Sequence, residues 1–130
     1  MEKRPDLRID AREASLGQIA VEMKLADKKH WTGITLLHKI ETQLASQYLK
    51  EPASHTGFYM LVNGSHPAKN EVRKGKIVRK SFKKKIGPRS IDFLELIDRA
   101  KIRAEKVTKH LPEGKVVEIC WADLSEHHEY

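Results

Sequence analysis

The chain has 130 residues, of which 39% are hydrophobic and 33% are charged, and its formal net charge is +7 at pH 7. This length supports one domain with a modest core, and the single cysteine, Cys120, excludes an intramolecular disulfide and a CxxC metal site. The sequence contains neither an apolar stretch near the ~20 residues of a membrane span nor an apolar signal core at its N-terminus. We therefore expect a cytoplasmic protein that does not bind membranes, and the positive charge favours an anionic partner, most often nucleic acid.

Apolar and polar residues alternate in two short segments near the N-terminus, residues 4–9 and residues 17–26. A period of two predicts β-strands, and the turn-prone residues between the segments predict a hairpin or a tight connection. Glu22 and Lys24 share one face of the second strand, and charges on a largely buried strand are costly unless each has a partner. The hairpin could bring Asp6 beside Glu22, where two carboxylates would suit Mg²⁺ or Mn²⁺. An edge hairpin that carries a surface ion pair is the structural alternative.

At these positions the chain resembles the PD-(D/E)xK nucleases, which carry an aspartate on one strand and an ExK sequence on the next. Pro5-Asp6 and Glu22-Met23-Lys24 match that motif. The resemblance implies a restriction-endonuclease-like fold and a Mg²⁺ cofactor, with Mn²⁺ as the alternative ion. It also implies metal ligation by Asp6 and Glu22, and catalytic roles for Asp6, Glu22 and Lys24.

The family fold has a helix and a strand before the metal-binding aspartate, whereas Asp6 stands near the start of this sequence. Three arrangements would account for the difference. Residues 1–130 could form a minimal single domain, or they could be the C-terminal part of a longer protein. Alternatively, a second copy in a homodimer, or a larger fused or partner protein, could supply the missing elements.

Residues 32–50 predict a helix, with Thr32 as the N-cap and Pro52 beyond the end. Apolar residues recur at steps of three and four from Ile34 onward. The expected inner face consists of Leu36, Leu37, Ile40, Leu44 and Tyr48. Gln43 and Gln47 are expected at the rim of that face.

Some PD-(D/E)xK nucleases carry a QxxxY signature on this helix, and the segment from Gln43 to Tyr48 is similar to it. The resemblance implies a catalytic role for Gln43. Because the tyrosine follows Gln43 by five residues instead of four, Gln47 is the alternative match. A glutamine that only hydrogen-bonds the backbone is the structural alternative.

The second half of the chain continues the alternation of strands and helices. An apolar run bounded by glycines, residues 57–64, predicts a central strand covered on both faces, and a helix followed by a buried strand implies a crossover. Residues 90–111 predict a helix capped by Ser90, with the inner face Ile91, Leu94, Ile97, Ala104, Val107 and Leu111. Residues 115–123 predict a last strand, in which Cys120 is a small core residue. The expected fold is α/β, with a mixed central β-sheet flanked by helices in the order β-β-α-β-α-β.

Residues 69–89 form a basic insertion in which Glu71 is the one acid. Such an excess of positive charge could neutralise several phosphates, with an affinity that falls as salt rises. Lysine-rich segments contact backbone charge more than base edges, so we expect little sequence preference. The candidate nucleic-acid-binding residues are Arg73, Lys74, Lys76, Arg79, Lys80, Lys83, Lys84 and Lys85. A solvated loop is the structural alternative.

The resemblance, together with the basic segment, implies a metal-dependent nuclease that hydrolyses phosphodiester bonds, with DNA favoured over RNA as the substrate. The first alternative is a catalytically inactive, nuclease-like module that binds nucleic acid or docks a partner protein. The second is an interaction domain that uses its basic segment to dock an acidic protein. The sequence contains no phosphate-binding loop of the Walker type, so we do not expect ATP-driven activity from it.

Overall fold

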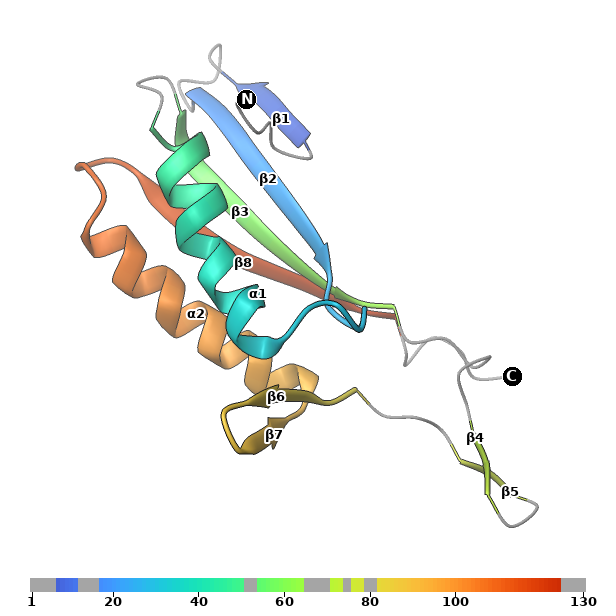
Figure 1. Ribbon diagram of the computed structural model, residues 1–130. Coiled ribbons are helices and arrows are strands. Elements are labelled where there is room, and N and C mark those ends of the chain that lie inside the picture. The colour runs from blue at the N-terminus through green and yellow to red at the C-terminus, as the bar shows by residue number, and fades with distance from the viewer. Residues whose placement is uncertain are drawn as a thin grey trace.

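The computed structural model describes residues 7–11, 17–50, 54–64, 71–73, 76–78 and 82–124 (Figure 1). Within these residues the chain forms a four-stranded sheet in the order β1-β2-β3-β8. The strands are β1 (Leu7–Ala11), β2 (Gly17–Leu25), β3 (Ser54–Asn63) and β8 (Val116–Asp123). β1 runs antiparallel to β2, whereas β2, β3 and β8 are parallel. The sheet is therefore mixed, and the two predicted N-terminal strands pair with each other.

Helices connect the parallel strands. Between β2 and β3 stand α1 (Gly33–Lys39) and the π-helix η2 (Ile40–Tyr48), which continues it without a break. α2 (Phe93–Lys109) precedes β8. None of the described helices is both long and apolar enough to cross a membrane. These main elements follow the predicted order β-β-α-β-α-β, and the fold is α/β as predicted.

The predicted basic insertion contains short antiparallel strands. β4 (Glu71–Arg73) pairs with β5 (Lys76–Val78), and β6 (Lys84–Ile86) pairs with β7 (Arg89–Ile91). Gly87 has a φ of 60° in the turn between β6 and β7, a backbone conformation that glycine adopts without steric cost. The glycine and proline of this segment thus allow a tight hairpin.

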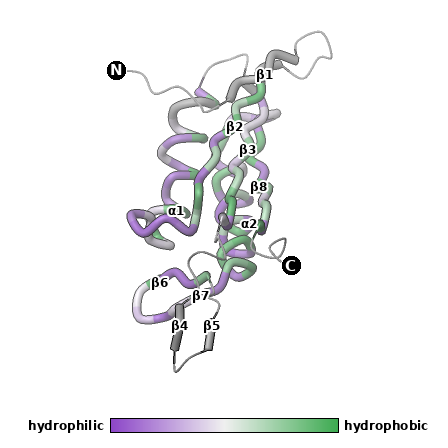
Figure 2. The backbone as a smooth tube through the Cα atoms, turned by 90° about the vertical axis from the view of Figure 1, so that its right-hand side faces the viewer, coloured by the Kyte–Doolittle hydropathy of each residue, from purple (hydrophilic) through white to green (hydrophobic). Residues whose placement is uncertain are grey.

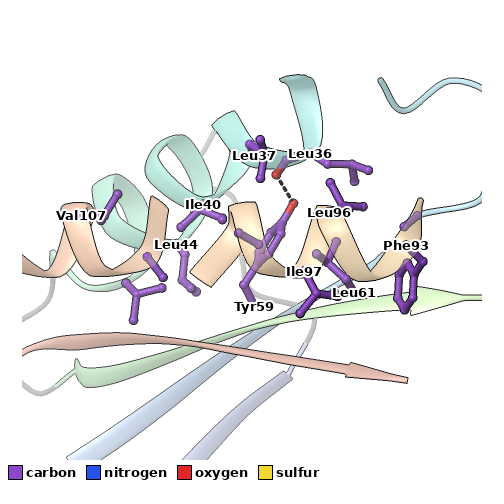
Figure 3. Packing of buried hydrophobic residues seen from close by; sticks show 14 of the residues in the cluster. Leu36, Leu37, Ile40, Leu44, Tyr59, Leu61, Phe93, Leu96, Ile97 and Val107 are labelled. Carbon is purple, nitrogen blue, oxygen red and sulfur yellow. Dashed lines mark hydrogen bonds between the residues drawn. The ribbon is translucent and has the colours of Figure 1, made fainter. Parts of the chain in front are cut away.

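Both helical segments lie on the same face of the sheet (Figures 1 and 3). The parallel strands follow one another across the sheet in the order β2, β3, β8. Because crossover connections are normally right-handed, two crossovers that advance in the same direction place their helices on the same face of the sheet. α2 accordingly contacts α1, η2 and β8. The expectation that helices would flank the sheet and cover β3 on both faces is therefore wrong for the described residues. Among the described residues, the sheet face away from the helices carries the half-buried Phe58 and Met60 and the exposed Met23 and Leu25.

Cys120 also lies on this second face, because it is the register partner of Met60. Its side chain is half-buried, so the prediction of a core cysteine is wrong. The partial burial raises the pKa of the Cys120 thiol above its ordinary value. A raised pKa leaves less thiolate at neutral pH, which makes this cysteine a poor nucleophile.

The core lies between the sheet and the helices (Figure 3). Its largest fully buried side chains come from both layers and include Leu36, Ile40, Leu44, Tyr59, Leu61, Leu96 and Ile97. The colouring in Figure 2 follows this division, with hydrophobic green where the central strands lie together and hydrophilic purple on the outer turns of α1 and on β6. Burial of one helix face and one sheet face against each other is the main stabilising contribution in such a layered fold.

The first helical segment begins as predicted and then changes its hydrogen bonding. The Thr32 side chain accepts a hydrogen bond from the Thr35 amide at 3.0 Å, which makes Thr32 the N-cap. Near the other end the Leu49 amide donates to the Leu44 carbonyl at 3.0 Å, and a bond across five residues is that of a π-helix. The angular positions of a regular α-helix therefore do not apply after Lys39. Gln43, expected at the rim of the packed face, is buried instead.

Tyr59 contributes to the junction between α1 and η2. The Ile40 amide bonds to the carbonyls of Leu37 and His38. The Tyr59 hydroxyl, which extends from β3 into the helical layer, donates to the Leu36 carbonyl at 2.6 Å (Figure 3). A buried carbonyl needs a partner, and a side chain of the sheet supplies one where regular α-helical bonding stops.

Asp92 caps α2, and the prediction that Ser90 is the cap is wrong. The Asp92 side chain accepts a hydrogen bond from the Glu95 amide at 2.8 Å. Ser90 cannot take this position because it belongs to β7, which pairs with β6. The inner face of α2 changes as well: Leu94 is 64% exposed, and the buried residues are Phe93, Leu96, Ile97, Ala100, Ala104 and Val107.

We expect Asp92→Ala to lower the free energy of unfolding by about 1 kcal/mol, since it leaves the first amides of α2 without their side-chain acceptor. Ser90→Ala, two residues away and exposed, should change it by less than about 0.5 kcal/mol. Urea denaturation followed by circular dichroism would measure both values. The opposite ranking would show that the helix is capped by Ser90 in solution.

Candidate active site

β2 directs Glu22 and Lys24 to the sheet face that the helices cover. The side chains of a strand alternate between its two faces, so Glu22 and Lys24 share one face with Ala20. Glu22 is 3% exposed and Lys24 is 8% exposed. Lys24 Nζ donates to Glu22 Oε1 at 2.8 Å. The prediction that they share a face is confirmed, and the alternative of a surface ion pair is wrong because the pair is buried.

Trp31 covers the lysine of this pair. The Lys24 ammonium lies 4.9 Å from the centroid of the Trp31 ring, within the range of a cation–π interaction. Trp31 belongs to the loop that connects β2 to α1, and its indole packs against the core. The ammonium therefore has an ionic partner on its own strand and an aromatic partner on the following loop.

Tyr59 lies beside Glu22 on the neighbouring strand, because the two are register partners across β2 and β3. Burial raises the pKa of the Tyr59 phenol far above its ordinary value, and the nearby Glu22 carboxylate raises it further. The phenol therefore stays protonated and keeps donating to the Leu36 carbonyl. The Tyr59 hydroxyl thus has a structural role, and the neutral phenol lies near the Glu22 carboxylate.

Glu22 Oε2 and Gln43 Oε1 are buried oxygen atoms without a hydrogen-bond partner among the described residues. Gln43 is 8% exposed and lies on η2, which contacts both β2 and β3. Most buried polar atoms in proteins are hydrogen-bonded, so each exception calls for an explanation. Carboxylate and amide oxygens are ligands that Mg²⁺ accepts.

The predicted metal site is only partly represented in the described residues. Glu22 offers one carboxylate oxygen that is not used by Lys24. Asp6, the second predicted ligand, lies outside the described residues; the adjacent Leu7 pairs with Val21. In the described part of the chain no three His, Cys, Asp or Glu side chains form a group that could hold a metal ion. Glu22 is therefore the one predicted ligand whose side chain the structure describes.

The predicted QxxxY match also falls partly outside what the structure describes. Gln43 is on η2 at the buried interface between helix and sheet. The side chains of Gln47 and Tyr48 are not among those described. Gln43 is thus buried with an unpartnered amide oxygen, and both its place in the site and its catalytic role stay predictions.

The last part of the basic segment lies next to this site. Lys84 Nζ donates to the carbonyl oxygens of Lys28 and Trp31, at 2.6 Å and 2.7 Å. Lys84 therefore attaches the hairpin of β6 and β7 to the loop that follows β2. Its neighbours Lys83 and Lys85 are exposed. Of the other predicted nucleic-acid-binding residues, Arg73 and Lys76 are described only in their backbone, and Lys74, Arg79 and Lys80 lie outside the described residues.

Two residues of the site, Trp31 and Tyr59, were not predicted from the sequence. The signal for Trp31 was a large aromatic residue directly after the basic run Lys28-Lys29-His30. Tyr59 gave no comparable signal, since one aromatic residue within an apolar strand is ordinary core composition. Its relation to Glu22 depends on the pairing of β2 with β3, which the sequence does not specify.

The chain was compared with models of protein families, with curated proteins and with solved structures, and none of these comparisons gave a match.

Proposed function

We propose that the chain is a metal-dependent nuclease domain that hydrolyses phosphodiester bonds of nucleic acid, with DNA favoured over RNA. One observation carries the proposal: Glu22 and Lys24 form a buried pair on β2, and Glu22 keeps one oxygen without a hydrogen-bond partner. A buried carboxylate oxygen without a hydrogen-bond partner destabilises the folded protein, but such an oxygen can ligate a metal cation. The hairpin before this strand and the helix after it are compatible with a restriction-endonuclease-like core, which we propose as the specific fold.

In this proposal Glu22 and Asp6 hold Mg²⁺ or Mn²⁺. The ion, when bound, would act as a Lewis acid toward the phosphate and lower the pKa of its water. Lys24 orients the attacking water or stabilises negative charge that develops on the phosphate, since it has three donors and Glu22 Oε1 accepts only one of them. Gln43, whose amide oxygen is buried without a partner, is proposed to contribute that oxygen to the site. The exposed lysines of the β6–β7 hairpin hold the substrate strand.

A specific observation favours the second candidate function, a catalytically inactive module that binds nucleic acid. Glu22 and Lys24 bond to each other and are 3% and 8% exposed. Trp31 covers Lys24, so a phosphate that approached the ammonium would have to displace or pass the indole. A buried ion pair of this kind can serve structure alone, and binding would then depend on the basic residues and on salt but on no metal.

Cleavage assays of the purified chain separate the two functions. Single-stranded and duplex DNA and RNA are incubated with Mg²⁺, with Mn²⁺ or with EDTA. A nuclease should cleave only with the ion, and Glu22→Gln should lower the rate by at least about 100-fold while nucleic-acid binding is retained. Asp6→Asn should have the same effect if both carboxylates hold the ion.

Glu118→Gln is the matched control, because Glu118 is an exposed acid on the other face of the sheet, paired in register with Phe58. This variant should cleave like the unmodified chain. Thermal melting of each variant shows whether a loss of activity reflects unfolding. Full activity in a folded Glu22→Gln protein would refute the assigned site, and binding without ion-dependent cleavage in the unmodified chain would establish the inactive module.

A further inference from the structure

We propose that His30 and Trp31, together with the lysines around them, form a stacking site for an unpaired nucleobase, so that the chain binds single-stranded nucleic acid at the end of β2. The inference rests on the nucleic-acid part of the proposed function and is independent of cleavage. It names the substrate class: a single strand, or an unpaired segment within a longer nucleic acid.

The two aromatic rings form a fixed platform. Their centroids are 4.7 Å apart, and the ring planes are inclined by 48°. His30 is exposed and Trp31 is half-buried, so part of the aromatic surface faces solvent while the rest is held by the core. The Trp31 amide donates to the Lys28 carbonyl at 3.1 Å, and Lys24 lies at 4.9 Å from the indole. A platform that is ordered before binding loses little conformational entropy when a base stacks on it.

Positive charge surrounds this platform from two segments that are far apart in the sequence. Lys28 and Lys29 are exposed on the turn that leads into His30. Lys83 and Lys85 are exposed on the hairpin that Lys84 attaches to the Lys28 and Trp31 carbonyls.

The backbone of this hairpin also reaches the start of α1. A Cβ atom added to Gly33 would lie 3.0 Å from the Lys85 carbonyl oxygen, so the two backbones are in close contact. Exposed lysines on both segments are therefore close to the aromatic pair, and such cations can neutralise the phosphates on either side of a stacked base.

The combination favours a single strand over a duplex. Every base has a π-face that can stack on an aromatic side chain, but in a duplex those faces are covered by neighbouring bases. Lysines that only neutralise phosphates would bind both forms. Aromatic side chains surrounded by lysines are thus typical of sites that bind unpaired bases.

Trp121 provides an internal comparison. It is 43% exposed, and the Lys101 ammonium lies 4.3 Å from its ring centroid, so it too is an accessible tryptophan with a cation. Its strand, however, carries the acid Asp123 two residues further on, on the same face as Trp121. Trp121 therefore lacks the basic surroundings of Trp31, and we expect it to take no part in binding.

Fluorescence titration tests the site directly, because the chain contains two tryptophans. Trp121→Phe leaves Trp31 as the one emitting indole, and Trp31→Phe leaves Trp121. Oligo(dT) and oligo(U) of about 16 nucleotides, the upper end of the site size of single-strand-binding folds, are added in EDTA and low salt. We expect both to quench the fluorescence of Trp121→Phe and to leave that of Trp31→Phe unchanged.

Affinity measurements complete the test. Trp31→Ala should weaken binding of labelled oligo(dT) by about tenfold or more, since stacking on an aromatic side chain contributes that much. Trp121→Ala should leave the affinity unchanged, Trp31→Phe should retain most of it, and a duplex of the same length should bind more weakly than the single strand. Thermal melting confirms that each variant is folded.

The outcomes distinguish this inference from the proposed function. Equal affinity of Trp31→Ala and the unmodified chain, quenching of Trp121, or stronger binding of the duplex would overturn the stacking site even if the chain cleaves nucleic acid. Binding through Trp31 without ion-dependent cleavage would support the site and refute the nuclease.

Discussion

Replacing Glu22 or Lys24 alone with methionine should destabilise the protein far more than replacing both. Each single substitution leaves one buried charge without its partner at 2.8 Å, and breaking a buried pair in this way costs about 3–5 kcal/mol. The double variant Glu22→Met, Lys24→Met removes both charges and places two side chains of similar volume in the same space. Exchanges of that kind are neutral or stabilising in many proteins. Urea denaturation of the four proteins gives the coupling energy of the pair.

The chain offers a matched control in Glu41 and Arg103. Their Oε1 and Nη1 atoms also lie 2.8 Å apart, but the side chains are 41% and 36% exposed. The same double-mutant cycle on this pair should give only about 0.2–1 kcal/mol. Equal coupling energies for the two pairs would contradict the buried environment of Glu22 and Lys24. A double variant as unstable as the sum of the single variants would contradict their direct interaction.

The features that the sequence predicts well are local. Alternation along residues 17–25 fixes which side chains share a face, so the relation of Glu22 to Lys24 could be predicted without knowing the neighbouring strands. The Thr32 cap is likewise encoded within a single helical turn. Each of these predictions depends on a few consecutive residues, and each agrees with the structure.

The predictions that are wrong depend on contacts between distant segments. Ser90 is a good capping residue, but it belongs to β7, which pairs with β6 in a hairpin. The helix therefore begins later, and Asp92 is its N-cap. The apolar periodicity counted from Ser90 predicts Leu94 on the inner face of the helix. The helix begins only at Phe93, and Leu94 is exposed. Coverage of β3 on both faces was predicted from its apolar run, but strand order, which the run does not specify, puts the described helices on one side.

The candidate site shows the same division. Glu22, Lys24 and Gln43 could be named because they belong to a motif or to a helix face. Tyr59 and Trp31 reach them only through the pairing of β2 with β3 and through the loop after β2. Gln43 is buried because the helix changes to π-type bonding, and single-residue propensities do not predict that change.

The contact between Gly57 and Leu44 gives the second large effect. Leu44 is fully buried in the core, so Leu44→Ala should lower the free energy of unfolding by about 2–5 kcal/mol. A Cβ atom at Gly57 would lie 2.8 Å from Leu44 Cγ, closer than these atoms can approach, and 3.0 Å from Leu44 Cδ1, tighter than most carbon contacts. Gly57→Ala should therefore cost about 1–3 kcal/mol through overpacking.

The two effects should not add. In the Leu44→Ala protein the leucine side chain is absent, so the methyl group of Gly57→Ala enters the vacated space instead of meeting Leu44. Its cost should fall to near zero or become a gain. Gly87→Ala is the control, because Gly87 has a φ of 60° and no atom within 4 Å of its Cβ position. Its cost is conformational and should be the same with or without Leu44.

This coupling also tests what maintains the π-helix. Leu44 accepts the five-residue hydrogen bond from Leu49 and packs on the one residue of β3 that has no side chain. If that packing fixes the path of η2, Gly57→Ala should shift the helix and with it the adjacent Gln43, so the variant should lose cleavage activity beyond its loss of stability. A folded Gly57→Ala protein with full activity and no coupling to Leu44 would instead show that this packing does not fix the path of η2.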